Sequence, residues 1–148
     1  MEYDEKKIRK SNTELEKKLL ADRKEWGKKI SIIVDMVKNI SQLAECQVLM
    51  LSYRQIILDK IIDIKSIVYK RKGFWEKHFK NKWRYYSLNY DVKLSNAEKN
   101  QFIKADLSEL KIQLNLLESH IDYYHECVRT LDNMAFAVRN RISLNNEE

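Results

Sequence analysis

The last third of the chain carries the most regular pattern of hydrophobic and polar positions. From Ile103 onward, apolar residues recur in alternating steps of four and three, which is the heptad spacing of a helix that packs along one face. These positions are Ile103, Leu107, Leu110, Leu114, Leu117, Ile121, Tyr124, Val128, Leu131, Ala135, Val138 and Ile142. Ser95 followed by Glu98 is the sequence of a capping box. The pattern predicts a helix over about 96–142 with a coiled-coil-like seam.

A second apolar stripe occupies the middle of the chain. Its members stay on one side when each residue is advanced by 100°, so they predict one long helix over about 50–86. They are Met50, Tyr53, Ile57, Ile61, Ile64, Val68, Trp75, Phe79 and Tyr86. Residues 87–94 have no helical period and supply a turn. Two long amphipathic helices joined by a short loop are expected to pack as an antiparallel hairpin.

The first third is less clearly patterned. Residues 1–29 are highly charged, with few apolar anchors, and predict a solvated helix or a partly disordered arm that ends near Gly27. A further helix is expected over about 30–48. The predicted domain organisation is a charged N-terminal arm over 1–29 and a helical domain over 30–148. Ile112, Leu116 and Phe136 lie off the seam and need cover from elsewhere. The expected architecture is therefore an all-α hairpin or bundle that self-associates.

Composition agrees with this architecture. The 148 residues include no proline and two glycines, so the main helix breakers are nearly absent and very long helices are permitted. No apolar run is long enough for a membrane span, and the N-terminus has no signal-peptide pattern, which predicts a cytoplasmic protein without a membrane partner. Cys46 and Cys127 stand alone and are expected to be small core residues.

Charge is concentrated in one stretch. Residues 69–86 contain seven Lys or Arg, seven aromatic residues and one acid, a surplus equal to the net charge of +6 of the whole chain. Cations neutralise phosphates and aromatic faces stack on unpaired bases, so the mixture suits single-stranded nucleic acid. The same composition is also typical of a solvated charged helix whose aromatic residues belong to the core. Helical phase places four cations on the side opposite the apolar stripe. Lys72 and Lys82 lie at the flanks of the stripe, and the rings that lie off the stripe are Phe74, Trp83 and Tyr85. The four cations are Lys70, Lys77, Lys80 and Arg84.

Catalytic and metal-binding motifs are not evident. Two glycines, Gly27 and Gly73, cannot form a Walker-type phosphate loop, and the three histidines share no metal-ligand spacing. The pairs Asp59–Asp63 and Glu118–Asp122 lack an accompanying histidine, and solvated helix faces explain them better. We expect neither an enzyme nor a bound cofactor or metal.

Three segments together resemble the UvsY family of phage recombination mediators. Residues 80–86, Lys-Asn-Lys-Trp-Arg-Tyr-Tyr, are similar to the end of that family's long basic helix, and residues 105–110, Ala-Asp-Leu-Ser-Glu-Leu, to the phrase after its loop. The run from Asn133 to Ile142 is similar to the close of its last helix, so the resemblance covers about residues 43–142.

The resemblance implies a non-enzymatic, ring-like homo-oligomer, a hexamer or heptamer, in the host cell cytoplasm. Such a protein binds single-stranded DNA, weakens the hold of the single-strand-binding protein, and promotes loading of a RecA-like recombinase during phage recombination, replication and repair. The motif match assigns the DNA-binding basic pair to Lys80 and Lys82. With the helical phase, the expected single-stranded DNA contacts are Lys70, Lys77, Lys80, Lys82, Trp83 and Arg84.

Two other interpretations remain open. The chain could be a non-enzymatic coiled-coil scaffold whose basic ridge meets an acidic partner. An anionic membrane surface is disfavoured, because Trp75 and Phe79 lie on the packing stripe, although Phe74 and Trp83 leave it open.

Overall fold

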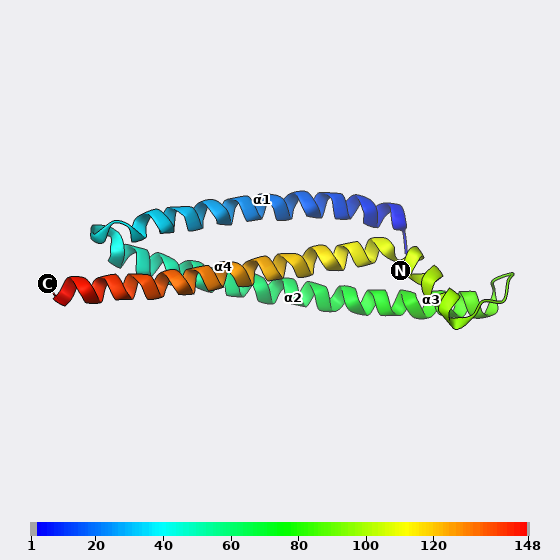
Figure 1. Ribbon diagram of the computed structural model, residues 1–148. Helices are drawn as coiled ribbons and strands as arrows, with labels where there is room; N and C mark the ends of the chain where they lie inside the picture. Colours follow the sequence, from blue (N-terminus) through cyan, green and yellow to red (C-terminus); the bar gives the residue numbers. More distant parts are fainter. Residues whose placement is uncertain (1–2, 148) are drawn as a thin grey trace. The chain divides into compact units, whose positions relative to one another are not determined.

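The computed structural model describes residues 3–147, and its elements are helices joined by short connections (Figure 1). Within these residues there is no strand, which confirms the all-α prediction. The elements in chain order are α1 (Glu5–Val37), the short 3₁₀ helix η1 (Ile40–Gln42), α2 (Leu43–Leu88), α3 (Asn96–Asp106) and α4 (Ser108–Glu147).

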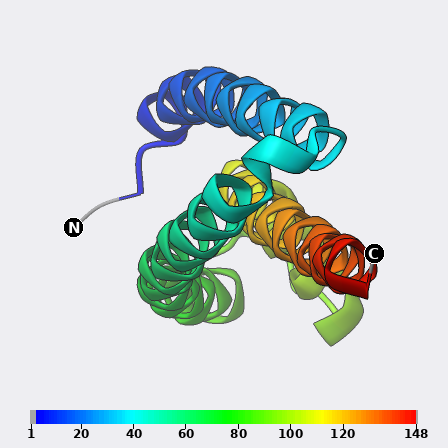
Figure 2. The same cartoon turned by 90° about the vertical axis from the view of Figure 1, so that its left-hand side faces the viewer.

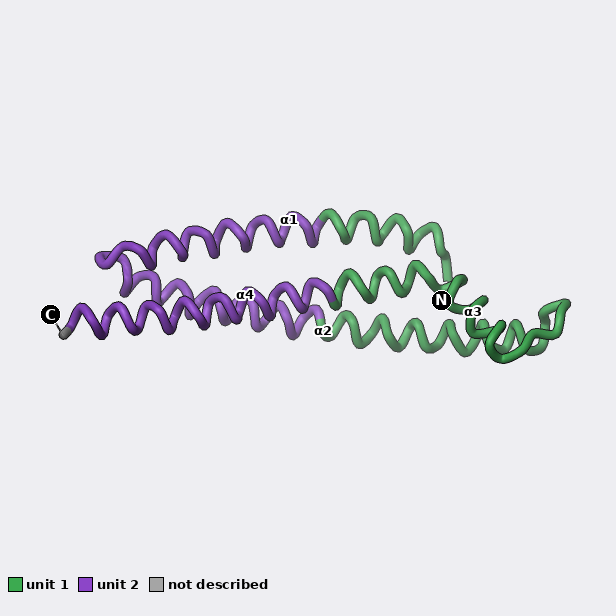
Figure 3. The backbone as a smooth tube through the Cα atoms, in the orientation of Figure 1, with its two compact units in different colours: residues 1–17, 65–118 green, residues 18–64, 119–148 purple. Residues whose placement is uncertain are grey.

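The described residues divide into two compact units (Figure 3). Unit 1 contains the chain up to Lys17 together with Lys65–Glu118. Unit 2 contains Lys18–Ile64 together with the chain from Ser119 onward. The predicted boundary between residues 29 and 30 coincides with neither division.

The expected arm ending near Gly27 is instead part of α1, which continues to Val37. A glycine inside a helix costs only about 1 kcal/mol relative to alanine. The burial of Trp26 and Ile33 on either side of Gly27 outweighs that cost. The predicted helix over 30–48 is also wrong, because the chain leaves the helix at residues 38–42. There the Asn39 side chain accepts a hydrogen bond from the backbone N–H of Ser41 and caps η1.

In unit 2, α1 and α2 run in opposite directions (Figure 1), and the connection between them faces the viewer in Figure 2. The Cys46 Sγ lies 3.9 Å from the carbonyl oxygen of Ile33. Farther from the connection, the rings of Trp26 and Tyr53 meet edge to face with centroids 5.5 Å apart. Cys46 and Cys127 are both buried with free thiols, as expected for core residues.

Helix α4 joins unit 2 through polar contacts centred on Asp22. One carboxylate oxygen of Asp22 lies 2.8 Å from Nε2 of the buried His120. The same oxygen accepts a hydrogen bond from the hydroxyl of Tyr124. Burial lowers the pKa of His120, although its hydrogen bond to Asp22 acts in the opposite direction. Further along, the Arg141 guanidinium donates to the carbonyl of Val37, a group that the end of α1 leaves without a helical partner.

In unit 1, the core is a buried cluster of Ile103, Leu107 and Leu110, referred to below as the unit 1 core cluster. Seven half-buried side chains from α1, α2 and the residues before α1 pack against it: Tyr3, Ile8, Phe74, Trp75, Phe79, Trp83 and Tyr86. Lys72 pairs with Glu118, whereas Tyr86, which comes later in α2, hydrogen-bonds to Asp106, which comes earlier in the chain than Glu118. Within this unit, α2 therefore packs antiparallel to α3 and α4, as the hairpin prediction requires.

The helix predicted over about 96–142 begins where expected. The Ser95 hydroxyl accepts from the N–H of Glu98 and the Glu98 carboxylate accepts from the N–H of Ser95, each at 3.2 Å, so the capping box is confirmed. The helix is interrupted at Leu107, however, and resumes as α4. No helix-breaking residue marks this position, and the Leu107 side chain is fully buried in the unit 1 core cluster.

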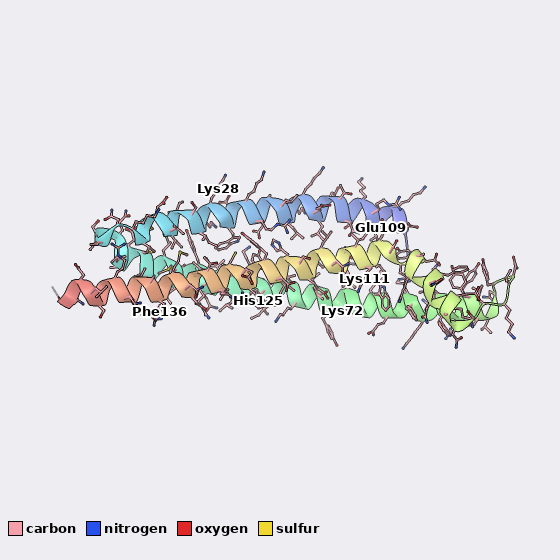
Figure 4. The ribbon with its side chains drawn as sticks, viewed as in Figure 1. Lys28, Lys72, Glu109, Lys111, His125 and Phe136 are labelled. Carbon is pink, nitrogen blue, oxygen red and sulfur yellow. The ribbon has the colours of Figure 1, made fainter. Side chains whose placement is uncertain are left out.

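The heptad pattern identified the inward side correctly. Nine of its twelve positions are buried and the other three, Val128, Ala135 and Ile142, are half-buried. Phe136, off this seam, is 61% exposed and points outward from α4 (Figure 4). The coiled-coil seam and the oligomer remain predictions.

The buried stripe of α2 can be tested by a matched pair of substitutions in unit 2. Ile57 is 0% exposed, whereas Ile62, five residues later on the same helix, is 66% exposed. Ile57→Ala should lower the free energy of unfolding by about 2–5 kcal/mol, because it leaves a cavity. Ile62→Ala should change it by no more than about 0.5 kcal/mol. Urea titration followed by circular dichroism measures both; equal effects would contradict the packing described for α2.

Candidate nucleic-acid interface

The basic and aromatic stretch lies on α2 in unit 1, and the unit 1 core cluster determines its orientation. Trp75, Phe79 and Tyr86 are half-buried against Ile103, Leu107 and Leu110. The helical phase read from the sequence is therefore confirmed for these three rings.

Four cations form an exposed row on the other side of α2, which we call the basic ridge: Lys70, Lys77, Lys80 and Arg84. At 100° per residue they fall within an arc of about 80°, and they extend over about 21 Å of helix. No carboxylate among the described side chains lies within ion-pairing distance of any of them. Their charges are thus available to an external anion.

Lys72 and Lys82 are placed differently. The Nζ of Lys72 lies 3.2 Å from a carboxylate oxygen of Glu118, and the Nζ of Lys82 lies 3.6 Å from Oδ2 of Asp106. Figure 4 labels Lys72 on α2. Lys82 is half-buried, so the structure brings it to the packed side of α2 rather than to the basic ridge. To contact a phosphate, Lys82 would have to leave Asp106.

The rings expected to be free are only partly so. Trp83 is half-buried against the unit 1 core cluster, with its ring nearly parallel to that of Phe79 and the Lys99 ammonium 5.2 Å from its centroid. Phe74 also packs against that cluster and meets the buried ring of His78. Ile8 of α1 packs against the same cluster, which the sequence pattern did not reveal. Tyr85 is exposed, as expected.

A surface groove of about 450 Å³ adjoins the basic ridge. It is lined by Phe79, Lys80, Trp83, Arg84, Ser87 and Leu88. All six lie on α2, so one helix provides the whole groove. Ser87 and Leu88 were not expected here, although their spacing of four from Trp83 and Arg84 is a signal that the sequence contains.

Asp106 connects the end of α2 to α3. The hydroxyl of Tyr86 donates to the Asp106 carboxylate, to which Lys82 also pairs. Burial, followed by this hydrogen bond, raises the pKa of the Tyr86 phenol, so it remains protonated and a donor at neutral pH. Tyr86, Tyr90 and Phe102 also meet edge to face, with centroids between 5.2 and 6.2 Å apart. These contacts fix the orientation of α2 at the grooved end of the basic ridge.

Residues 3–147 also bear on metal binding and on membrane insertion. No group of three or more His, Cys, Asp or Glu side chains in this range is arranged to hold a metal ion. No helix in the same range is long and apolar enough to cross a membrane. His78 and His120 are buried and His125 is exposed (Figure 4).

Comparison with protein-family models, curated proteins and solved structures finds no match to this chain.

The link through Asp106 can be tested with two neighbouring tyrosines. Tyr86→Phe removes a hydrogen bond to a carboxylate and should lower the free energy of unfolding by about 1–2 kcal/mol. Tyr85→Phe is the control, because the Tyr85 hydroxyl has no hydrogen-bond partner among the described residues and its ring is exposed. Urea titration of both variants measures the difference, and equal stability would show that the Asp106 contact contributes nothing.

Proposed function

We propose that this chain binds single-stranded DNA through the basic ridge and acts as a recombination mediator. The observation that carries the proposal is the row of four exposed and unpaired cations beside a groove that contains two aromatic rings. An ordinary solvated helix face also carries carboxylates, but the only acid in residues 69–86 is Glu76.

The chemistry of the basic ridge suits a flexible anionic strand. Lys80 and Arg84 are one helical turn apart, about 6 Å along the axis, and each can neutralise a phosphate. Four cations on one chain bind weakly, so a ring-like homo-oligomer would raise the affinity by effective concentration. The resemblance to the UvsY family supports this assembly and adds Lys82 to the contacts.

The DNA-binding proposal predicts a specific loss. Lys80→Ala combined with Arg84→Ala should weaken binding to an unstructured oligonucleotide by about tenfold or more at low salt. The slope of log affinity against log salt should become less steep by about 1.4, or about 0.7 for each phosphate that the variant no longer neutralises. Fluorescence polarisation at several salt concentrations measures both quantities.

A charge-matched control comes from α1. Lys24→Ala combined with Lys28→Ala removes two exposed cations outside the basic ridge; Lys28 lies on the outer side of its helix (Figure 4). This variant should retain most of the affinity. An equal loss in both variants would indicate a response to net charge alone and would remove the assignment to the basic ridge.

The mediator role needs its own measurement. Wild-type protein added to an oligonucleotide covered by a single-strand-binding protein should accelerate the loading of a RecA-like recombinase. The Lys80→Ala/Arg84→Ala variant should lose this effect, because it no longer holds the strand. Recombinase filament formation, followed by its DNA-dependent ATP hydrolysis, reports the rate; an unchanged rate with wild-type protein would refute the mediator role while leaving DNA binding intact.

A coiled-coil scaffold whose basic ridge meets an acidic partner is the second candidate, and a groove with exposed apolar residues in unit 2 favours a protein contact. This groove has a volume of about 540 Å³ and is lined by residues of α2 and α4 that include Val48, Leu51 and Ala135. Val48 and Leu51 are largely exposed, and apolar surface of this kind is typical of a protein contact. The scaffold interpretation expects no oligonucleotide binding in the polarisation measurement.

A further inference from the structure

The groove beside the basic ridge is formed by two rows of side chains on α2. Residues four apart form rows along a helix surface, and a groove separates adjacent rows. One row is Phe79, Trp83 and Ser87, and the other is Lys80, Arg84 and Leu88. An aromatic wall therefore faces a wall whose first two members are cations.

The two walls differ in how firmly they are held. Phe79 and Trp83 are half-buried against the unit 1 core cluster, and their rings are nearly parallel, with an interplanar angle of 19° and centroids 6.3 Å apart. Lys80 and Arg84 are exposed and unpaired among the described side chains. The aromatic wall is thus preorganised by packing, while the cations can adjust to the position of a phosphate.

We propose that this groove is a subsite for one unpaired nucleobase, which stacks on Trp83 while Lys80 and Arg84 hold the flanking phosphates. The inference rests on the proposed function and specifies how the site recognises its substrate. The groove volume of about 450 Å³ is within the range of small-ligand sites, and the charge of its cationic wall is opposite to that of a nucleotide phosphate.

Lys99 leaves the groove open to a base. Its ammonium lies 5.2 Å from the centroid of the Trp83 ring, but Lys99 does not line the groove. Its ammonium adds a positive charge beside the Trp83 ring. A base in a duplex is stacked and paired, so it cannot enter such a groove without being unpaired. The subsite accordingly favours single strands over duplexes.

The experiment compares two labelled oligomers of equal length and phosphate number, an oligothymidine and an abasic strand. Fluorescence polarisation should show that wild-type protein binds the oligothymidine about fivefold or more tightly, since stacking on an aromatic side chain contributes to affinity for each base. Trp83→Ala should remove this preference and retain binding to the abasic strand. Trp83→Phe, which keeps a ring in the groove, should restore part of the preference.

Tyr69→Ala is the matched control, because Tyr69 is an exposed aromatic residue on α2 outside the groove. It should leave the preference unchanged. Circular dichroism checks that each variant is folded, and if Trp83→Ala unfolds, the wild-type preference and Trp83→Phe still decide. Equal wild-type affinity for the two strands, or a preference that survives in folded Trp83→Ala, would overturn the subsite but not DNA binding. Failure of wild-type protein to bind either strand would overturn both.

Discussion

Burial of Ile103, Leu107 and Leu110 against the aromatic side of α2 is the constraint on which the candidate site depends. In unit 1, this packing covers the side that carries Trp75, Phe79 and Tyr86 and leaves Lys70, Lys77, Lys80 and Arg84 in solvent. The contact of Asp106 with Tyr86 and Lys82 then fixes the rotation of α2 at the end where the groove lies. The basic ridge is a consequence of this apolar packing.

Unit 2 is organised by a different mixture of forces. Its apolar core includes the side chains of Trp26, Ile33 and Ile57, while the buried His120 and the hydroxyl of Tyr124 both depend on the carboxylate of Asp22. A buried polar group is costly unless it is hydrogen-bonded, so these contacts specify which faces of α1 and α4 meet. Apolar surface remains exposed at Val48 and Leu51.

Much of the fold could be predicted because it follows from local periodicity. The heptad positions from Ile103 to Ile142 are buried or half-buried, and the capping box at Ser95 begins α3 as expected. The break expected near Gly27 is absent, because the burial of Trp26 and Ile33 outweighs the weak helix-breaking preference of one glycine. The actual break between α1 and α2 lies at residues 38–42. The interruption at Leu107 had no local signal. In the candidate site, the exposed cations were predictable from helical phase. The packing of Trp83 and the pairing of Lys82 with Asp106 were not, because they involve residues far apart in sequence.

The sequence by itself determined that the chain is helical, which residues of α2 and α4 face inward, and where its surplus positive charge is concentrated. These properties depend on residue type and on spacing within one helix, where 3.6 residues per turn fix the relation between neighbours. The tertiary structure decided which cations are free and which are paired, and which rings are covered. Each of these depends on side chains that different helices bring together, or on how far a neighbouring helix covers a given face, and spacing along one helix contains no record of that.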